Sequence, residues 1–501
     1  MDDLFDQIII GTGPSAFACH KSLPAGSNCL ILDSSCHPAS KNNYSEILLG
    51  SNNFKINQIL RGDSANVKTD SGIINKAFSG LDYTVISDVT KVTLLKKSSN
   101  NFGGLSPYWG HQLIRYTQND LNEIGIGLNY SELMPFYDVL EKYIGLSKAS
   151  ESIKLDLFYD LKNVNYQRNF ISNNIAAKLS GTRIKKIFNE SLFFDSPLLA
   201  LAQPQIFEDK NNENLNFYGI NSEKTFDCSK YFSQFLNENK ILQNRRVLKV
   251  MHENNICKVV AVNDCGDFFE YKSRKVFLAA GCINTAEIIR KSLGLTEIKT
   301  HFCDHRTRLM PVFIRKSITD VNKHINQLVG IRKIYKKIHN FMSLYSLSSM
   351  TNFDVSRLTG LPYPFSLLPV NMLREHFHVL QIWENEFDCS QLILNDGEIK
   401  ILDNHQKISL SNIFYINLLR HGIYPLSFAS KYTFMGEGFH FVGTFAGTNN
   451  NKKFQTDRLG QLIDLKNIHL IDGSVIPKLT VKNSSLLQMA NAARITKEVY
   501  S

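Results

Sequence analysis

A glycine-rich segment near the start of the chain has the residue types and spacing needed to hold a dinucleotide. Gly11-Thr12-Gly13-Pro14-Ser15-Ala16 is a G-x-G-x-x-A pattern that follows an apolar strand and opens a helix. In that setting Gly11 permits a tight turn, Gly13 lets the backbone approach a pyrophosphate, and Ala16 keeps the helix close to the sheet. Asp33 stands 20 residues after Gly13, at the end of the next strand, where a carboxylate can bind a ribose hydroxyl. These residues predict a dinucleotide site without deciding between NAD and FAD.

Two further segments combine glycine with small residues, and each also has an ordinary structural interpretation. Residues 101–110, NFGGLSPYWG, form either a loop that can pass close to a flat ligand or a surface turn with a buried tryptophan. Residues 276–282, VFLAAGC, read as a buried strand that ends in small residues, which would also suit close packing of a helix. Neither segment indicates a function by itself.

The C-terminal region completes a pattern that resembles the glucose–methanol–choline oxidoreductase family. Residues 438–448 read GFHFVGTFAGT, and residues 468–490 read IHLIDGSVIPKLTVKNSSLLQMA. Members of that family open with G-x-G-x-x-G/A, carry a GGxS flavin loop and have an LAAG strand before a helix. They end with H-x-x-G-T, a D-G-S turn and an Asn-containing segment before the last helix. All these elements occur here in family order, over about half of the chain.

The resemblance implies FAD as the cofactor and assigns residues to it. Gly11, Gly13 and Asp33 would hold the pyrophosphate and the adenosine ribose, and a strand near Val247 would contact the adenine side through its backbone. The last helix would direct its positive end at the flavin N1–C2=O edge, where negative charge accumulates on reduction. The full set of cofactor-binding residues implied is Gly11, Gly13, Ala16, Asp33, Gly103, Gly104, Ser106, Gly110, Val247, Asp472, Gly473 and Ser484.

The same resemblance implies a catalytic pair, His440 and Asn483. His440 matches the family's catalytic histidine, and Asn483 matches its His-or-Asn partner. Hydride transfer from an alcohol carbon to flavin N5 requires removal of the hydroxyl proton, which a neutral imidazole can accept near neutral pH. The asparagine can donate a hydrogen bond to the same substrate oxygen. On its own, a histidine in an apolar stretch is more often a structural residue.

Three positions depart from the family pattern. Ser484 stands where the family often has proline, and Arg306 replaces the proline of a D-H-P motif at Asp304-His305. Tyr108 occupies the position at which some sugar-oxidising relatives attach flavin covalently through histidine, so we expect non-covalent FAD, with His111 as the alternative attachment point.

The order of predicted elements indicates an α/β protein with a discontinuous Rossmann-like FAD-binding domain and a mixed or antiparallel-sheet substrate domain. Strand–turn–helix patterns occur at the start, near residues 274–293 and in the last 60 residues. We therefore assign 1–125, 215–305 and 430–501 to the FAD-binding domain, and 126–214 and 306–429 to the substrate domain. Tyr130 to Ile144 is expected to form an amphipathic helix with Ser131 at its N-cap.

Residues 331–342, IRKIYKKIHNFM, have apolar positions at helical spacing with basic residues between them. This pattern predicts a helix packed on its own domain. The alternative is a basic amphipathic helix that touches an anionic membrane surface, and the packed helix is favoured.

Composition restricts the class of protein. The chain has 501 residues, is 43% hydrophobic and 20% charged, and carries a dispersed net charge of +10, which fits a globular protein without a nucleic-acid-binding stripe. Nine cysteines form no C-x-x-C pair, so we expect buried thiols, with neither a disulfide framework nor a metal site. The acidic first residues and the absence of a long apolar run favour a cytoplasmic protein.

The function expected is oxidation of a CH–OH group in a small alcohol, sugar or polyol, with the electron acceptor and the oligomeric state left open. Two alternatives use the same scaffold: a non-redox lyase, and a catalytically silent flavin-binding subunit.

Overall fold

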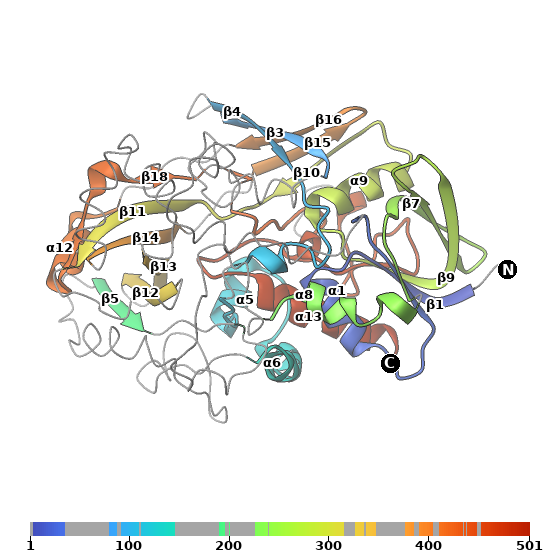
Figure 1. The fold of residues 1–501 in the computed structure, drawn as a ribbon, viewed down its shortest axis with the longest axis horizontal. Helices are drawn as coiled ribbons and strands as arrows, with labels where there is room; N and C mark the ends of the chain where they lie inside the picture. Colours follow the sequence, from blue (N-terminus) through green and yellow to red (C-terminus); the bar gives the residue numbers. More distant parts are fainter. Residues whose placement is uncertain are drawn as a thin grey trace.

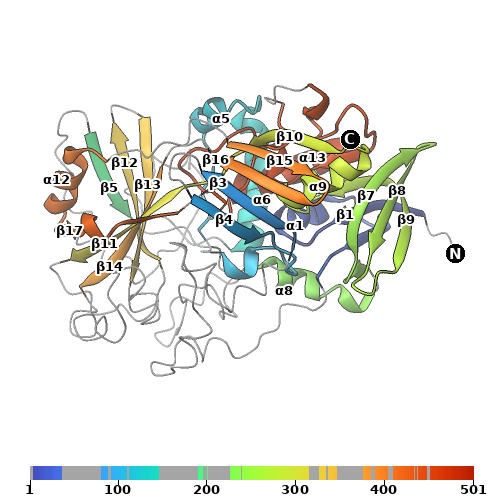
Figure 2. The same ribbon diagram turned by 90° about the horizontal axis from the view of Figure 1, so that it is seen from above.

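The computed structural model describes residues 4–35, 80–87, 92–109, 112–145, 190–195, 200, 226–238, 240–314, 326–334, 337–346, 376–384, 390–403, 410–433, 435–436, 438–447 and 452–501. Within these residues the strands form three sheets. Figure 1 shows the first sheet, with β1, β7 and β9, at one end of the molecule and the third sheet, with β11 to β14, at the other. The second sheet lies along the edge between them, as both views show (Figures 1 and 2).

The first sheet assembles strands from the start, the middle and the end of the chain. Its order is β6-β2-β1-β9-β8-β7, with β19 also paired to β9. The strands are β1 (Leu4–Ile10), β2 (Cys29–Leu32), β6 (Ile241–Leu242), β7 (Arg246–Glu253), β8 (Ile256–Val262), β9 (Phe268–Leu278) and β19 (Ile468–Leu470). β1 pairs in parallel with both β2 and β9, and β19 also runs parallel to β9. Such strands are buried on both faces, which explains the continuous apolar run Ile8–Ile10.

Helices cover the first sheet and carry the glycine-rich segments. They include α1 (Pro14–Ser22), α8 (Cys228–Ser233), α9 (Cys282–Ser292) and α13 (Ser485–Val499), and α13 packs against both α1 and α6. Among the described residues, this half also contains α5 (Gln118–Ile124) and α6 (Tyr130–Ile144). The expected helix over 130–144 is therefore confirmed, but its N-cap is Asn129 and not Ser131. The reason is that the Glu132 carboxylate accepts a 2.7 Å hydrogen bond from the Asn129 N–H, which caps the first turn two residues before Ser131.

The second and third sheets complete the fold. The second has the order β10-β15-β16-β3-β4. Its strands are β3 (Asp82–Ser87), β4 (Val92–Lys97), β10 (Glu297–Phe302), β15 (Ser390–Asn395) and β16 (Glu398–Asp403). The third sheet contains β5 (Glu190–Asp195), β11 (Thr307–Ile314), β12 (Asn326–Ile334), β13 (Lys337–Ser346), β14 (Phe377–Glu384), β17 (Ile423–Pro425) and β18 (Lys431–Tyr432). It is antiparallel throughout its recorded pairings, and α12 (Asn412–Arg420) covers it with Phe414 and Leu418 in a core of its own.

These sheets give the α/β fold that was expected, with a Rossmann-like sheet built from distant segments and an antiparallel sheet beside it. The second sheet draws β3, β4 and β10 from the segments assigned to the FAD-binding domain and β15 and β16 from the substrate segments. The exact domain boundaries therefore stay a prediction.

The helix predicted over residues 331–342 is wrong, because this segment belongs to two paired strands. β12 and β13 are antiparallel, with Ile331 opposite Phe341. Short apolar stretches match both the helical and the strand period, and β-branched and aromatic side chains such as Ile331 and Phe341 favour the strand. Since no helix forms, the membrane-surface alternative for this segment is also withdrawn.

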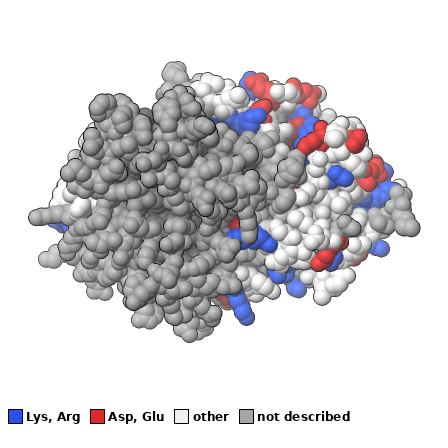
Figure 3. Space-filling view, in the orientation of Figure 1, with Lys and Arg blue, Asp and Glu red and all other residues white. Residues whose placement is uncertain are grey.

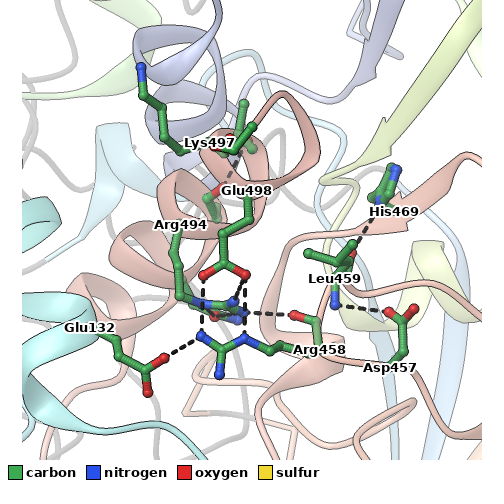
Figure 4. A network of polar contacts seen from close by, with 12 residues as sticks. Glu132, Asp457, Arg458, Leu459, His469, Arg494, Lys497 and Glu498 are labelled. Atoms are coloured by element: carbon green, nitrogen blue, oxygen red, sulfur yellow. Dashed lines mark hydrogen bonds and ion pairs between the residues drawn. The ribbon is translucent and has the colours of Figure 1, made fainter.

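An ion-pair network fixes the last helix against α6 and the loop before β19. Arg458 pairs with Glu132 of α6 and with Glu498 of α13 at 3.2 Å, and Arg494 pairs with Glu498 at 2.9 Å. Figure 4 shows the Arg458 guanidinium between the two carboxylates. Arg494 also donates a 2.8 Å hydrogen bond to the Arg458 carbonyl, so the network holds the chain that precedes the C-terminal strand.

Positive and negative side chains alternate on the described part of the face shown in Figure 3, which agrees with a dispersed net charge. Within the parts of the chain that the structure describes, no helix is long and apolar enough to cross a bilayer.

Candidate active site

A cavity of about 620 Å³ joins the two glycine-rich segments to His440 and Asn483. The predicted site residues among its walls are Gly11, Gly13, Asp33, Gly104, Ser106, Val247, His440, Asp472, Gly473 and Asn483. Ala16, Gly103 and Ser484 are not part of the wall, and Gly110 lies outside the described residues, as does His111. Most of the sequence-predicted residues are therefore brought to one cavity, although they come from segments hundreds of positions apart.

The turn between β1 and α1 has the geometry that requires glycine. Gly11 has φ +102°, and a Cβ there would lie 2.6 Å from the Ala279 carbonyl oxygen at the end of β9. Gly13 forms the N-cap of α1, and Pro14 follows as the first helical residue. The N-terminus of α1 consequently opens at the cavity, where its unpaired N–H groups suit an anionic phosphate.

The second glycine segment lies directly on the first. A Cβ at Gly104, which has φ +62°, would come within 3.0 Å of the Gly13 Cα. The Gly103 N–H donates a 2.8 Å hydrogen bond to the Thr12 hydroxyl, and that hydroxyl donates to Asp33 at 2.5 Å. Thr12 thus connects both glycine segments to the acidic residue. Sequence reasoning missed Thr12, whose only signal was its place inside the G-x-G pattern.

Asp33 is held in place by neighbouring donors. Its carboxylate also accepts hydrogen bonds from the Ser35 N–H at 2.9 Å and from the Ser35 hydroxyl. Burial raises the pKa of Asp33, while the hydrogen bonds from Ser35 and Thr12 act to lower it. The carboxylate is therefore oriented at the cavity edge beside the end of β2.

Two other predicted residues serve mainly to shape the wall. The Ser106 hydroxyl donates to the Gly103 carbonyl at 2.7 Å and accepts from the Cys228 N–H at 2.8 Å, which ties the loop to the start of α8. Ala16 is fully buried inside α1, where a small side chain allows close packing. Val247 lies on β7 and faces the cavity together with neighbouring residues of that strand.

Asp472 connects the start of α9 to its own turn at the cavity wall. Its carboxylate accepts hydrogen bonds from the Gly281 N–H at 2.8 Å, the Thr285 hydroxyl at 2.6 Å and the Ser474 N–H at 2.9 Å. Burial raises the pKa of Asp472, and these donors oppose the shift. A Cβ at Gly473 would lie 2.2 Å from the Phe441 carbonyl oxygen, so only glycine fits beside the His440 segment.

The two predicted catalytic residues line the same cavity. Asn483 precedes α13, where its Oδ1 accepts from the Ser485 N–H at 2.8 Å and its Nδ2 donates to the Gln112 carbonyl at 3.2 Å. His440 is half-buried, and its Nδ1 lies 2.7 Å from Nδ1 of His305. Ser484 begins the helix, fully buried, and its hydroxyl accepts from Gln488 at 2.9 Å. The contacts with Ser485 and Gln112 therefore hold the Asn483 amide, and the contact with His305 holds the His440 ring.

Asp304 braces the backbone that carries His440. The buried Asp304 carboxylate accepts hydrogen bonds from the N–H groups of Gly436 at 2.9 Å, Gly438 at 2.8 Å and His440 at 2.9 Å. Burial raises the pKa of Asp304 to about 7, and the backbone donors act against that rise. Next to His440, Phe439 has φ +58°, which is an uncommon conformation for a bulky residue. The hydrogen bonds that Asp304 accepts from the N–H groups of Gly438 and His440 hold the backbone in this conformation.

The position at which Arg306 replaces the family's proline also has a structural explanation. Arg306 forms a buried ion pair with Asp403 at the end of β16. This pair links the second sheet to the start of β11, directly after Asp304 and His305. Arg306 therefore makes a contact between the second sheet and the start of the third.

The end of the cavity beside the third sheet is lined by neutral side chains. Those residues are Thr307, Leu309, Tyr345, Gln381, Trp383 and Thr433. The Thr307 N–H donates to the Thr433 hydroxyl at 2.8 Å, and Gln381 donates to the Thr307 hydroxyl at 3.3 Å. Aromatic surface with hydroxyl and amide groups can bind a neutral polar molecule. No motif in the sequence pointed to these residues.

One expectation about cysteine is wrong. Cys303 is disulfide-bonded, whereas Cys19, Cys29, Cys228, Cys257, Cys265 and Cys282 are free thiols. The spacing of the cysteines along the chain carried no sign of that bond. In the described ranges no cluster of His, Cys, Asp and Glu could hold a metal ion.

Comparison with solved structures relates the whole chain to known oxidases. A formate oxidase from Aspergillus oryzae RIB40, in a variant made to study FAD modification, matches with a TM-score of 0.63 at 13% identity, covering 100% of this chain and 98% of that chain. Pyridoxine 4-oxidase from Mesorbium loti matches with a TM-score of 0.60 at 11% identity, covering 99% of each chain. No family model and no curated protein sequence matches. These likenesses show that the chain has the two-domain fold of those oxidases.

Proposed function

We propose that this chain is an FAD-dependent oxidoreductase of the glucose–methanol–choline type that oxidises a CH–OH group of a small molecule. The observation that carries the proposal is the single cavity that joins the glycine turn and Asp33 to His440 and Asn483. Its shared fold with a formate oxidase and a pyridoxine 4-oxidase supports the same reaction class.

The residues around the cavity fit FAD. Gly11 and Gly104 let the two glycine segments and the end of β9 pack closely at the cavity wall, and the N-terminus of α1 offers backbone N–H groups to a pyrophosphate. Asp33 would bind the adenosine ribose, and the β7 backbone near Val247 would border the adenine. Asp472 and Gly473 would border the ribityl arm, with the N-terminus of α13 near the flavin ring.

Bound FAD would supply an acceptor for the hydride that leaves the substrate carbon. In the proposed mechanism, His440 accepts the proton of the substrate hydroxyl while the carbon–hydrogen bond breaks. Asn483 donates to Gln112 through one N–H of its amide, and the amide carries a second N–H that would bind the substrate oxygen. The product is then a carbonyl compound, and the enzyme retains one hydride and one proton, which together are two electrons and two protons.

The neutral side chains at the far end of the cavity support an uncharged alcohol as the substrate. Gln381, Thr307 and Thr433 would hydrogen-bond hydroxyl groups, and Trp383 and Tyr345 would cover apolar faces. Sugars, polyols and aromatic alcohols all combine these two kinds of surface.

The proposal is tested by purifying the protein and mixing it anaerobically with a panel of sugars and alcohols. We expect a yellow protein whose visible flavin absorption is lost with at least one neutral alcohol. A protein that takes up no flavin would contradict the proposal. A flavin-loaded protein that converts its substrate with the flavin remaining oxidised under anaerobic conditions would replace it with a non-redox function.

A further inference from the structure

His305 connects the ring of His440 to a backbone carbonyl. Its Nδ1 lies 2.7 Å from Nδ1 of His440, and its Nε2 lies 2.5 Å from the carbonyl oxygen of Thr480. The two rings are nearly perpendicular, at 85°, so they meet edge-on and do not stack. His305 itself is fully buried.

These contacts permit one arrangement of protons in the neutral pair. A carbonyl oxygen only accepts hydrogen bonds, so Nε2 of His305 must carry a proton and donate to Thr480. A neutral imidazole carries one proton, which leaves a lone pair on Nδ1 of His305. The proton between the two Nδ1 atoms must then belong to His440. A doubly protonated His305 is disfavoured, because burial lowers its pKa to about 4.

We infer that His305 is a positioning residue that fixes His440 as the Nδ1–H tautomer and so leaves the lone pair on Nε2, the nitrogen that accepts the substrate proton. This inference rests on the proposed function for the role of His440, whereas the tautomer itself is a property of the resting protein. When His440 gains a proton on Nε2, its Nδ1–H remains bonded to His305, so the ring does not have to turn during the reaction.

The chain that fixes His305 also carries Asn483. Thr480 stands three residues before Asn483. The segment between them is anchored by the Tyr116 hydroxyl, which donates to the Lys482 carbonyl at 2.9 Å. On the other side, Asp304 holds the backbone of His440. His305 therefore sets the ring of His440 relative to the segment that carries its partner in the proposed reaction.

The tautomer can be measured without turnover. We would label the histidine rings with ¹⁵N, load the protein with FAD and record long-range ¹⁵N–¹H correlations at neutral pH. The signals that disappear in His440→Gln identify His440, and we expect the pattern of an Nδ1–H tautomer. An Nε2–H pattern for His440 would overturn the inference, and it would do so in a protein whose His305 is unaltered.

Two substitutions at His305 supply the kinetic test. In His305→Asn the Oδ1 atom approximates the position of Nδ1 and can still accept from His440, whereas His305→Gln places its terminal group at the Nε2 position and removes that acceptor. We expect anaerobic flavin reduction to slow at least about tenfold in the Gln variant. The largest slowing expected equals the loss of His440 as a base, which is about 10²–10⁴-fold. The Asn variant should stay closer to wild type, with equal flavin content in both.

The outcomes separate this inference from the proposed function. Slow reduction in His440→Gln together with normal reduction in both His305 variants would overturn the role of His305 and leave His440 as the base. Normal reduction in His440→Gln would instead contradict the proposed function. If neither His305 variant folds, the ¹⁵N pattern of His440 still decides the inference.

Discussion

Thr12 donates a 2.5 Å hydrogen bond to Asp33 and accepts one from the Gly103 N–H, so one hydroxyl connects the predicted ribose-binding acid to the predicted flavin loop. Both partners are far from Thr12 in sequence, and Thr12 is 1% exposed. The hydroxyl therefore lies where binding of the adenosine half and of the flavin half of FAD would be coupled.

We expect Thr12→Val to weaken FAD binding. The substitution keeps the shape but leaves the Gly103 N–H without its acceptor and removes a donor to Asp33, at a cost of about 1–3 kcal/mol for each buried group left unpaired. Thr12→Ser is the matched control, because it keeps the hydroxyl. The FAD dissociation constant can be measured by fluorescence titration of the deflavinated proteins. Equal affinities for the Val and Ser variants would show that the connection has no energetic role.

We expect Gly11→Ala to be much more damaging than Gly26→Ala. Both glycines have positive φ, +102° and +78°, but a Cβ at Gly11 would lie 2.6 Å from the Ala279 carbonyl oxygen, whereas nothing lies within 4 Å of one at Gly26. Gly26→Ala should cost only the backbone strain, roughly 1–2 kcal/mol. Gly11→Ala should in addition displace β9 from the turn and lower flavin content. Chemical denaturation and flavin occupancy measure the two effects, and similar results for both variants would contradict the close approach.

We expect FAD to be bound without a covalent bond, because Tyr108 stands at the position where some relatives attach it through histidine. Acid precipitation should release intact FAD into the supernatant. Flavin retained in the washed pellet would contradict this expectation and direct attention to His111, which lies outside the described residues.

The network around Arg458 should make stability depend on pH in the acid range. Burial would raise the pKa of Glu498, but hydrogen bonds and charges from Arg458 and Arg494 outweigh it and lower that pKa below 4.5. A carboxylate whose pKa is lowered on folding contributes stability above its unfolded pKa and loses it as pH falls through the folded pKa. Since Arg458 and Glu498 are partly exposed, we expect Glu498→Gln to cost about 1 kcal/mol or less at pH 7.

That cost should shrink below about pH 4, which urea denaturation at pH 3.5, 5 and 7 would measure. Glu297→Gln is the control, because Glu297 pairs only with Lys299 among the recorded ion pairs and both side chains are about half exposed. An effect of Glu498→Gln that stays constant with pH would show that the network acts through packing and not through charge.

Local patterns in the sequence predicted the parts of the fold that depend on local interactions. The β1–α1 turn follows from Gly11 and Pro14, and the helix over Tyr130–Ile144 follows from its apolar spacing. The segment at 331–342 was mispredicted, because its apolar residues stand at helical spacing, whereas pairing with the distant strands β5 and β14 places it in strands.

Functional residues were predictable only where they belong to a motif. His440, Asn483 and Asp33 lie in such motifs and line the cavity. The connections made by Thr12 and by His305 depend on partners 91 and 135 positions away, which no local spacing reveals. The residues at the end of the cavity proposed for the substrate lie in or next to strands of the third sheet. Along such strands the alternation of apolar and polar side chains indicates which of them are buried, but it does not indicate which of them bind a substrate.

The central claim is that His440 accepts the substrate proton, with Asn483 binding the same oxygen. The most direct measurement is the rate of anaerobic flavin reduction in His440→Gln and in wild type across a range of pH. We expect the wild-type rate to fall at low pH, because a protonated imidazole cannot accept the hydroxyl proton. His440→Gln should retain FAD and reduce it about 10²–10⁴-fold more slowly. A His440→Gln protein with full FAD and a near-normal rate of reduction would contradict the claim.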